Sequence, residues 1–102
     1  MEFRIGRLVF EWDEGKAESN TEKHGVPFED AATVFMDGSA KTYYDQDHSD
    51  DEDRYFTIGF ARSGRLLTVW YTERADRLRL IGARRATSLE HKRYNADTKE
   101  EG

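Results

Sequence analysis

The sequence predicts one small α+β domain, in which a short strand and two helices come first, an antiparallel β-meander follows and a further helix ends the chain. A length of 102 residues allows a single hydrophobic core. Helical patterns lie before residue 40 and after residue 86, whereas alternating β-prone runs fill residues 54–83. Such segregation is typical of an α+β domain with helices on one face of the sheet. Charged residues make up 36% of the chain, but the 13% of aromatic residues favour a folded domain.

The first elements are expected to be a short strand and a polar helix. Residues 8–12 form an apolar run that predicts a strand. Asp13 is a suitable N-cap for a helix over residues 14–23, which the pair His24 and Gly25 ends with a cation and a C′ glycine. Because its apolar content is poor, packing determines this helix only weakly.

A second helix is predicted from Pro27 to the turn at residues 37–38. Proline suits the first turn of a helix, since the N–H that it lacks would find no partner within the helix. Apolar side chains at i, i+3, i+4 and i+7 form one helical face, made of Phe28, Ala31, Ala32 and Phe35. We expect this face to pack on the sheet.

The sheet is predicted from four further runs, residues 40–44, 54–61, 65–72 and 77–83. In the second run Phe56 and Ile58 alternate with Tyr55 and Thr57, the period of a half-buried strand. Gly64 supplies a residue that tolerates positive φ in the loop before the third run. The runs therefore predict an antiparallel meander.

The segment between the first two of these runs is acidic. Residues 45–53 hold six acids in nine positions, and like charges without an apolar anchor predict a solvated loop. A calcium-binding EF-hand loop would need glycine where Asp50 stands and glutamate where Phe56 stands. The calcium interpretation therefore fails at the two most demanding positions.

A last helix is predicted from the segment Thr87–Glu90, in which threonine and glutamate three residues apart form a capping box. This helix is expected to reach about Tyr94, and the polar tail of residues 95–102 is expected to fray. We therefore expect a single domain over residues 1–102 with its core at about 8–94.

Charge is divided unevenly along the chain. Residues 1–53 carry 5 basic and 15 acidic groups, a net charge of −10, whereas residues 54–94 carry 10 basic and 3 acidic groups, a net charge of +7. Nine of those ten basic residues are arginines, whose planar guanidinium suits bidentate phosphate contacts and stacking on bases. The segment indicates either a phosphate-facing surface or a solvated charged face.

Several classes of function are excluded. The absence of cysteine excludes a disulfide framework, a thiolate zinc site and a cysteine nucleophile. No apolar run approaches the ~18 residues of a membrane span, and the first residues lack a signal-peptide stretch, so we expect a cytoplasmic protein. Nucleotide-binding and serine-hydrolase motifs are absent, and His24, His48 and His91 lack metal-ligand spacing. We therefore expect neither a cofactor nor a metal.

The residues that remain for chemistry are mostly cations: Lys23, His24, Arg74, Arg77, Arg79, Arg84 and Arg85. RNA is cleaved without a metal when a base takes the proton of the ribose 2′-OH, cations stabilise the phosphorane and an acid protonates the leaving 5′-oxygen. The same residues also fit a structural interpretation, in which Lys23 and His24 complete a helix C-terminus and Arg84 pairs with Glu90 or another carboxylate. Spacing alone favours the structural interpretation.

An ordered set of short segments is more specific than any single motif. They are Phe10–Asp13, Lys16–Ala17, Asn20, Lys23–Val26, Phe28–Ala31, Arg54, Ile58–Gly59, Gly64–Leu67, Tyr71–Arg74, Ala83–Thr87, Glu90 and Tyr94. With them, residues 8–94 resemble the BrnT family of toxins from bacterial type II toxin–antitoxin systems. The chain departs from the family at Pro27 and Gly82, where serine is frequent, which leaves no hydroxyl at either position.

This resemblance implies a RelE-type ribonuclease fold and an endoribonuclease toxin that blocks translation. It further implies neutralisation by a BrnA-type antitoxin, which carries the DNA-binding part and represses the shared operon, so that DNA is met only through the antitoxin. The competing interpretations are a non-catalytic RNA- or ribosome-binding module and a purely structural partner-binding domain.

The resemblance also places a site on this chain. Arg84 and Arg85 are expected to clamp the phosphate, with Lys23 as a second cation and Arg74, at the end of the long strand, as a further site residue. His24 and then Glu73 are the candidates for the base. Arg77 and Arg79 are expected to bind RNA and to attract an acidic antitoxin segment. Trp12 either stacks on a base or, as the sequence favours, packs in the core.

Overall fold

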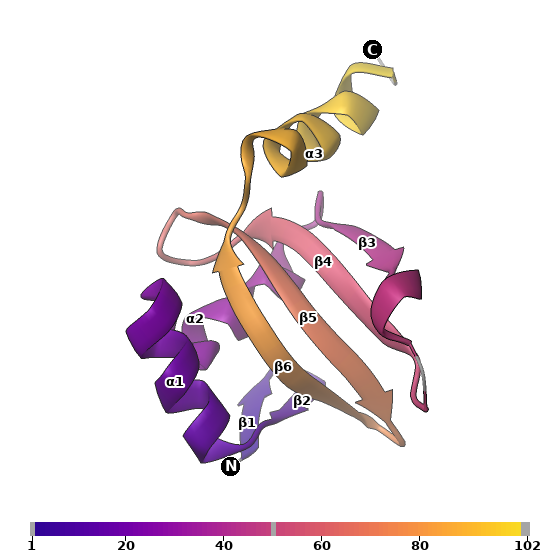
Figure 1. Cartoon of the computed structure of the whole chain (residues 1–102). Helices are drawn as coiled ribbons and strands as arrows, with labels where there is room; N and C mark the ends of the chain where they lie inside the picture. The colour runs from indigo at the N-terminus through magenta and orange to yellow at the C-terminus, as the bar shows by residue number, and fades with distance from the viewer. Residues whose placement is uncertain (1, 50, 101–102) are drawn as a thin grey trace.

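Six strands form one sheet in the order β1-β2-β6-β5-β4-β3 (Figure 1). The strands are β1 (Glu2–Ile5), β2 (Leu8–Glu11), β3 (Lys41–Tyr44), β4 (Arg54–Phe60), β5 (Leu66–Arg74) and β6 (Arg77–Arg85). The helices are α1 (Glu14–His24), α2 (Phe28–Ala32) and α3 (Ser88–Glu100), with 3₁₀ turns η1 (Thr33–Met36) and η2 (Gln46–His48). This computed structural model describes residues 2–49 and 51–100 and confirms the α+β class.

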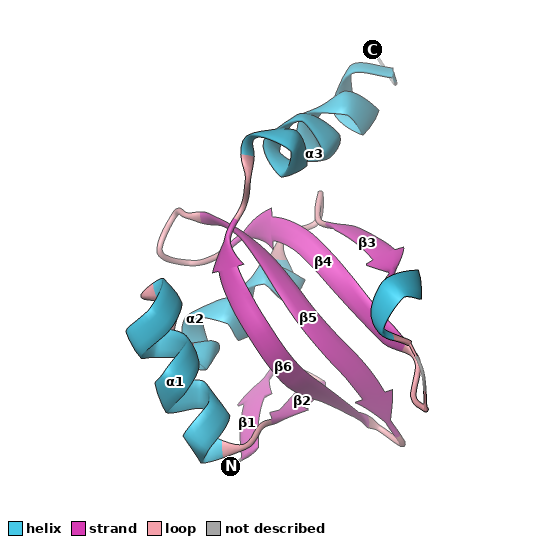
Figure 2. Ribbon diagram, viewed as in Figure 1, coloured by secondary structure: helices cyan, strands magenta, loops and turns pink. Residues whose placement is uncertain are grey.

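The helices are distributed unequally over the sheet (Figure 2). α1 and α2 lie against β6 on one side, whereas α3 stands at the far end of the strands. Much of the second sheet face is therefore left without a covering helix.

None of the helices in the described part of the chain combines the length and apolar character needed to cross a membrane.

The caps predicted for α1 are confirmed. The Asp13 carboxylate accepts a hydrogen bond of 2.9 Å from the amide of Lys16, and Gly25 adopts a φ of 69° at the other end. None of the helix's own residues is fully buried. Its position is therefore set by its ends and by polar contacts to the sheet more than by an apolar stripe.

The second predicted helix is shorter than its apolar pattern suggested. The α-helical part covers only α2, and η1 continues it as a 3₁₀ turn. The Thr33 hydroxyl donates to the carbonyl of Asp30 at 2.6 Å and accepts from the amide of Arg62 at 2.8 Å. This side-chain bonding competes with regular helical bonding and draws the chain towards the β4–β5 loop.

The predicted antiparallel meander is confirmed for β3 to β6, but it is not the whole sheet. β1 pairs with β2 in a hairpin whose turn contains Gly6 at a φ of 58°. β2 then pairs in parallel with β6, from Val9 opposite Arg77 to Glu11 opposite Arg79. The sequence does not indicate β1, because its four residues carry two charges, and it does not indicate the parallel pairing, because nothing local encodes it.

The C-terminal elements extend beyond the predicted boundaries. β5 runs through Arg74, and the turn is reduced to Ala75 and Asp76. The capping box is confirmed, with the Glu90 carboxylate 2.8 Å from the Thr87 amide. However, α3 continues to Glu100 instead of ending near Tyr94. The expected fraying of the polar tail stays a prediction, and residues 101–102 lie outside the described residues.

Two apolar clusters lie on opposite faces of the sheet. The larger is formed by α2, η1 and the sheet residues that face them, including Phe10, Leu67 and Leu80. A Cβ on Gly59 would come within 2.9 Å of Val34 Cγ1, so glycine lets β4 and η1 approach closely. The smaller cluster, Ile58, Leu66 and Tyr94, anchors α3 to the other face.

Candidate functional site

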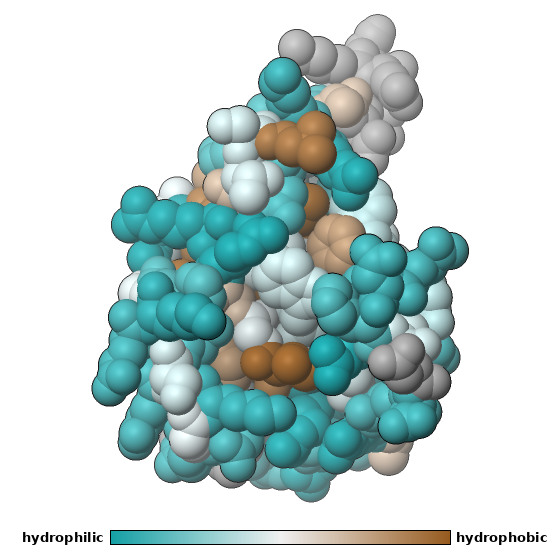
Figure 3. Space-filling model, in the orientation of Figure 1, coloured by the Kyte–Doolittle hydropathy of each residue, from teal (hydrophilic) through white to brown (hydrophobic). Residues whose placement is uncertain are grey.

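The face of the sheet beside α3 carries a row of aromatic rings. Tyr43, Phe56 and Trp70 lie on neighbouring strands, with ring centroids 5.2 Å apart for the first pair and 5.9 Å for the second. Figure 3 shows this face hollowed at its centre and bordered mainly by hydrophilic side chains. A row of half-buried rings on an open sheet face is suited to stacking against planar ligands.

This face contains a depression of about 250 Å³, which we call the sheet hollow. It is lined by Asp45, His48, Arg54, Trp70, Ile81 and Gly82. The β5–β6 register skips one residue, because Trp70 faces Gly82 while Tyr71 faces Leu80. Ile81 is thus the extra residue of a β-bulge, and a bulge of this kind redirects side chains at the border of a site.

One wall of the sheet hollow is an imidazole–carboxylate pair in the acidic segment. His48 Nδ1 lies 3.0 Å from Asp45 Oδ2, and the side chains are 64% and 9% exposed, respectively. Ser49 braces the turn, since its hydroxyl donates to the Asp45 carbonyl at 2.6 Å and accepts from the Arg54 amide at 2.9 Å. This part of the predicted solvated loop is therefore an ordered turn.

The ion pair of Arg84 and Glu90 lies beside Trp70, one of the residues that line the sheet hollow. The two guanidinium nitrogens lie 2.7 and 3.0 Å from the carboxylate oxygens, and Arg84 Cζ lies 4.9 Å from the Trp70 ring centroid. Burial raises the pKa of Glu90, but hydrogen bonds from Arg84, the Thr87 amide and Thr68 outweigh it and lower the pKa to about 2. Arg84 is therefore bonded to α3 and also contacts the indole of Trp70, which lines the hollow.

Lys23 and His24 border a separate groove of about 530 Å³ between α1 and β6. Both side chains are exposed. Ile81 lines this groove as well as the sheet hollow, so the two depressions meet at the bulge. The structure thus brings the predicted pair on α1 to the same half of β6 as Arg84 and Arg85.

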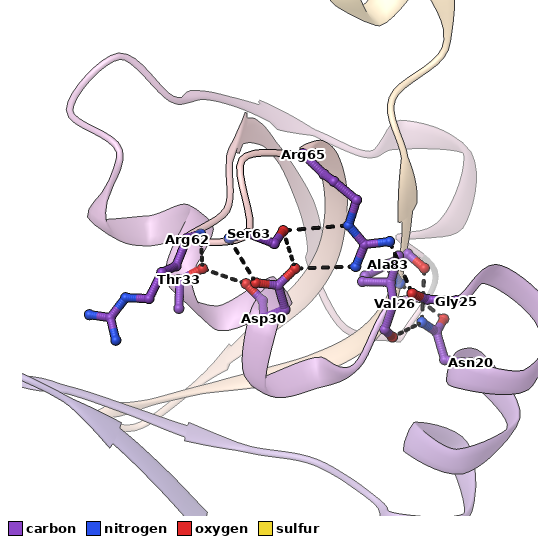
Figure 4. Close-up of polar contacts among 9 residues, drawn as sticks. All are labelled: Asn20, Gly25, Val26, Asp30, Thr33, Arg62, Ser63, Arg65 and Ala83. Atoms are coloured by element: carbon purple, nitrogen blue, oxygen red, sulfur yellow. Dashed lines mark hydrogen bonds and ion pairs between the residues drawn. The ribbon is translucent and has the colours of Figure 1, made fainter.

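Polar contacts hold α1 and the α1–α2 turn in place (Figure 4). The Asn20 amide donates to the carbonyls of Ala83 and Val26 at 2.9 and 3.0 Å, and its oxygen accepts from the Ala83 amide at 3.1 Å. Arg65 donates to the Gly25 carbonyl at 3.1 Å and pairs with Asp30 at 3.3 Å. Asn20 and Arg65, which belong to the ordered set of segments singled out in the sequence, therefore have structural roles.

The remaining predicted cations lie at the opposite end of β6. Arg77 pairs with Glu2 and Glu11, and Arg79 pairs with Glu11 at 3.2 Å. The β5–β6 turn is roughly 26 Å along the strand from Arg85. The guanidinium groups of Arg77 and Arg79, which are predicted to contact RNA, are therefore already paired with carboxylates.

Two further predicted site residues, Arg74 and Glu73, lie at the end of β5, beside this same end of β6. Arg74 is bonded to Glu52 at 2.9 Å, and this bond, followed by weaker charge effects, lowers the pKa of Glu52. Glu73 faces Leu78 in the β5–β6 register. The structure does not bring either residue to Arg84 and Arg85.

Trp12 belongs to the core. Its side chain is almost fully buried, with its ring 5.7 Å from Phe28 and 5.8 Å from Phe3. The stacking role considered for it would require an accessible ring, so core packing accounts for its position. On the open face, Trp70 is the accessible indole.

Sequence reasoning missed most of the sheet hollow. His48 was assigned to a solvated loop, and Trp70 and Arg54 were assigned only to strands. Trp70 alternates with buried Val69 and Tyr71, so strand periodicity alone places it on the other face. No local signal places Asp45 and His48 beside Gly82, because that contact depends on the order of the strands.

The fold and the hollow are those of a small α+β domain with an aromatic, cation-bordered face suited to a phosphate-bearing polymer. Residues 12–90 match the family described as ribonuclease toxin, BrnT, of type II toxin–antitoxin systems. The chain therefore belongs to the BrnT family of ribonuclease toxins.

A solved structure agrees with this assignment. The ribonuclease toxin BrnT of Brucella abortus is 26% identical, with a TM-score of 0.58, over 76% of this chain and 94% of that one. A search of curated proteins finds no significant match. Among the residues described here, no group of three or more His, Asp or Glu side chains is arranged to hold a metal ion.

Proposed function

We propose that this toxin is a RelE-like, metal-independent endoribonuclease that acts in the cytoplasm as a single domain and inhibits translation by cutting RNA. The attacking nucleophile in this proposal is the ribose 2′-OH, and the products are a 2′,3′-cyclic phosphate and a 5′-hydroxyl. The observation that carries the proposal is the sheet hollow, which combines an accessible indole with cations on a face left open by the helices. Base stacking on Trp70 would place the backbone beside these cations.

The phosphate contacts of this proposal lie at the C-terminal half of β6. Arg84 contacts the Trp70 ring that lines the sheet hollow, Arg85 is exposed one residue further along β6 and starts from the opposite face of the sheet, and Lys23 lines the groove across the bulge. Cations in this position would stabilise the charge that develops on the phosphorane. Because Arg84 also binds Glu90, its replacement is expected to weaken the fold as well as cleavage, whereas replacement of Arg85 removes an exposed cation only.

The proposed protein partner is a BrnA-type antitoxin, and contact with DNA would be made only through it. Four of the nine arginines between residues 54 and 94 already pair with carboxylates from residues 2–52: Arg65, Arg74, Arg77 and Arg79. The proposal assigns the exposed Arg85 and Lys23 to an acidic antitoxin segment. Binding there would compete directly with RNA phosphates.

The test is to incubate the purified protein with an unstructured RNA oligonucleotide in the presence of EDTA. We expect cleavage, with cyclic phosphate and 5′-hydroxyl ends, and none when the scissile ribose is replaced by 2′-deoxyribose. Products with 5′-phosphate ends, or activity restored by one particular metal, would contradict the proposed chemistry. Salt-dependent binding without cleavage would identify a non-catalytic RNA-binding module instead.

A further inference from the structure

We propose that His48, positioned by Asp45, is the general base that takes the proton of the attacking 2′-OH. This inference rests on the proposed ribonuclease function and adds a residue that the sequence analysis did not select. It depends on the geometry of the sheet hollow, in which an imidazole fixed by a buried carboxylate shares one depression with the accessible indole of Trp70.

The pair has the arrangement that a general base requires. Asp45 holds Nδ1 of His48 at 3.0 Å, which leaves Nε2 as the nitrogen available to a ligand. The backbone that carries this carboxylate is braced, because the Asp45 amide donates to the Arg54 carbonyl at 2.9 Å and the Asp45 carbonyl accepts from the Ser49 hydroxyl at 2.6 Å. A base held by a carboxylate that is braced in turn keeps one ring orientation and one tautomer.

The position of the ring relative to the other groups fits a bound nucleotide. A base stacked on Trp70 would place its ribose and phosphate near His48 and Arg54, which line the hollow, and near Arg84, which contacts the indole ring. By contrast, His24 lies in the groove beyond the bulge, and Glu73 lies near the β5–β6 turn. Of the three candidate bases, His48 is the one that lines the same depression as the indole.

In the proposed reaction, His48 acts in the transesterification step that cleaves the RNA chain. The 2′-oxygen forms a bond to phosphorus while its proton passes to Nε2 of His48, and the bond between phosphorus and the 5′-oxygen breaks. The leaving 5′-oxygen takes a proton from solvent, and the imidazolium later returns its proton to solvent. No oxidant, reductant or cofactor is needed, and the products are the 2′,3′-cyclic phosphate and the 5′-hydroxyl.

The charged surroundings of the imidazole come from two elements. Asp45 and Asp47 lie in its own turn, and Arg54 comes from β4. The residues of β5 and β6 that line the hollow in the described part of the chain are Trp70, Ile81 and Gly82, which carry no charge. A pH profile measured on this site therefore reports on a small set of groups.

The experiment measures RNA cleavage against pH for the wild type, His48→Gln and His91→Gln. His91 is an exposed histidine of α3 with no assigned role and serves as the matched control. We expect His48→Gln to lower kcat by at least ~100-fold with little change in KM, and to lose the fall in rate that protonation causes at low pH. His91→Gln should keep the rate and the profile of the wild type, and Asp45→Asn should lower kcat by a smaller factor at unchanged KM.

A second variant separates catalysis from folding. Free imidazole should restore cleavage by His48→Ala, because the vacated position opens on the hollow, and thermal unfolding should show both His48 variants folded. Wild-type rates in His48→Gln, or a loss confined to His24→Gln or Glu73→Gln, would overturn the assignment while leaving the ribonuclease function intact. A wild-type protein that cuts no RNA would overturn both.

Discussion

The two halves of β6 carry similar arginines in different settings. In the N-terminal half, Arg77 and Arg79 pair with Glu11 on the neighbouring parallel strand. In the C-terminal half none of the described strands pairs with the outer edge of β6, Arg84 pairs with Glu90 of α3, and Arg85 is exposed. The acidic and basic parts of the sequence fold against each other, so net charge along the chain overstates the cationic surface. The half of β6 without a neighbouring strand is the half that borders the sheet hollow.

The largest expected effect concerns Asn20, which bonds to the edge of β6 beyond Arg79, where β2 no longer pairs. Asn20→Ala removes three hydrogen bonds and leaves the Ala83 amide and carbonyl without them, so we expect the free energy of unfolding to fall by about 3 kcal/mol. Urea denaturation measures this loss. Ser19→Ala, an exposed neighbour on α1, is the control and should change stability by less than about 0.5 kcal/mol. A loss as small as the control would show that the edge of β6 is held by other contacts.

The next effect concerns pH and the ion pair of the C-terminal half. Because the pKa of Glu90 is lowered from 4.5 to about 2, its carboxylate stabilises the fold above pH 4.5, and this stabilisation is lost as pH falls towards 2. Glu90→Gln should remove this part of the pH dependence, about 2 kcal/mol. Denaturation at pH 5 and at pH 2 measures it. The exposed Glu52, whose pKa is lowered by Arg74, is the matched comparison, and Glu52→Gln should leave the pH dependence nearly intact.

RNA affinity should depend more on the exposed Arg85 than on the arginines that form ion pairs. Arg85→Ala is expected to weaken binding several-fold and to reduce the slope of log K against log salt by about 0.7, the value for one phosphate contact on a single strand. Fluorescence anisotropy with a non-cleavable 2′-deoxy oligonucleotide measures both quantities. An unchanged slope would remove Arg85 from the phosphate contacts.

The smallest effect is expected at the N-terminal half. Arg77→Ala should leave the salt slope within error, because Glu2 and Glu11 already neutralise this guanidinium. Its stability cost should be about 0.5 kcal/mol, as is usual for partly exposed pairs. The same anisotropy titration provides the measurement. A reduction as large as that of Arg85→Ala would mean that RNA displaces the glutamates and that both halves bind it.

The sequence was sufficient for features that are encoded locally. The caps of α1, the capping box of α3 and the β3–β6 meander follow from neighbouring residues and were predicted close to their observed positions. The pairing of Arg84 with Glu90 was also open to prediction, because the two lie six residues apart on a strand end and a helix start. These features depend on spacing within a short stretch.

What could not be predicted depends on strand order. The parallel pairing of β2 with β6 joins residues nearly seventy positions apart, and it determines which arginines form ion pairs with Glu11. The neighbourhood of His48 with Trp70 and Gly82 has the same origin, since three separate strands and a turn form it. In the sequence, His48 stands among acids that indicate only solvent exposure.

The bonds from Asn20 to Ala83 also bear on how the protein behaves in a crowded solution. A strand edge with a free amide and carbonyl can template the addition of a strand from another molecule, which is the first step of aggregation. The outer strands β1 and β3 have only four residues each, whereas β6 has nine and is left unpaired by β2 beyond Arg79. By bonding to both backbone groups of Ala83, one side-chain amide occupies the place where a foreign strand would begin to pair. Asn20 thus helps to keep individual molecules apart as well as folded.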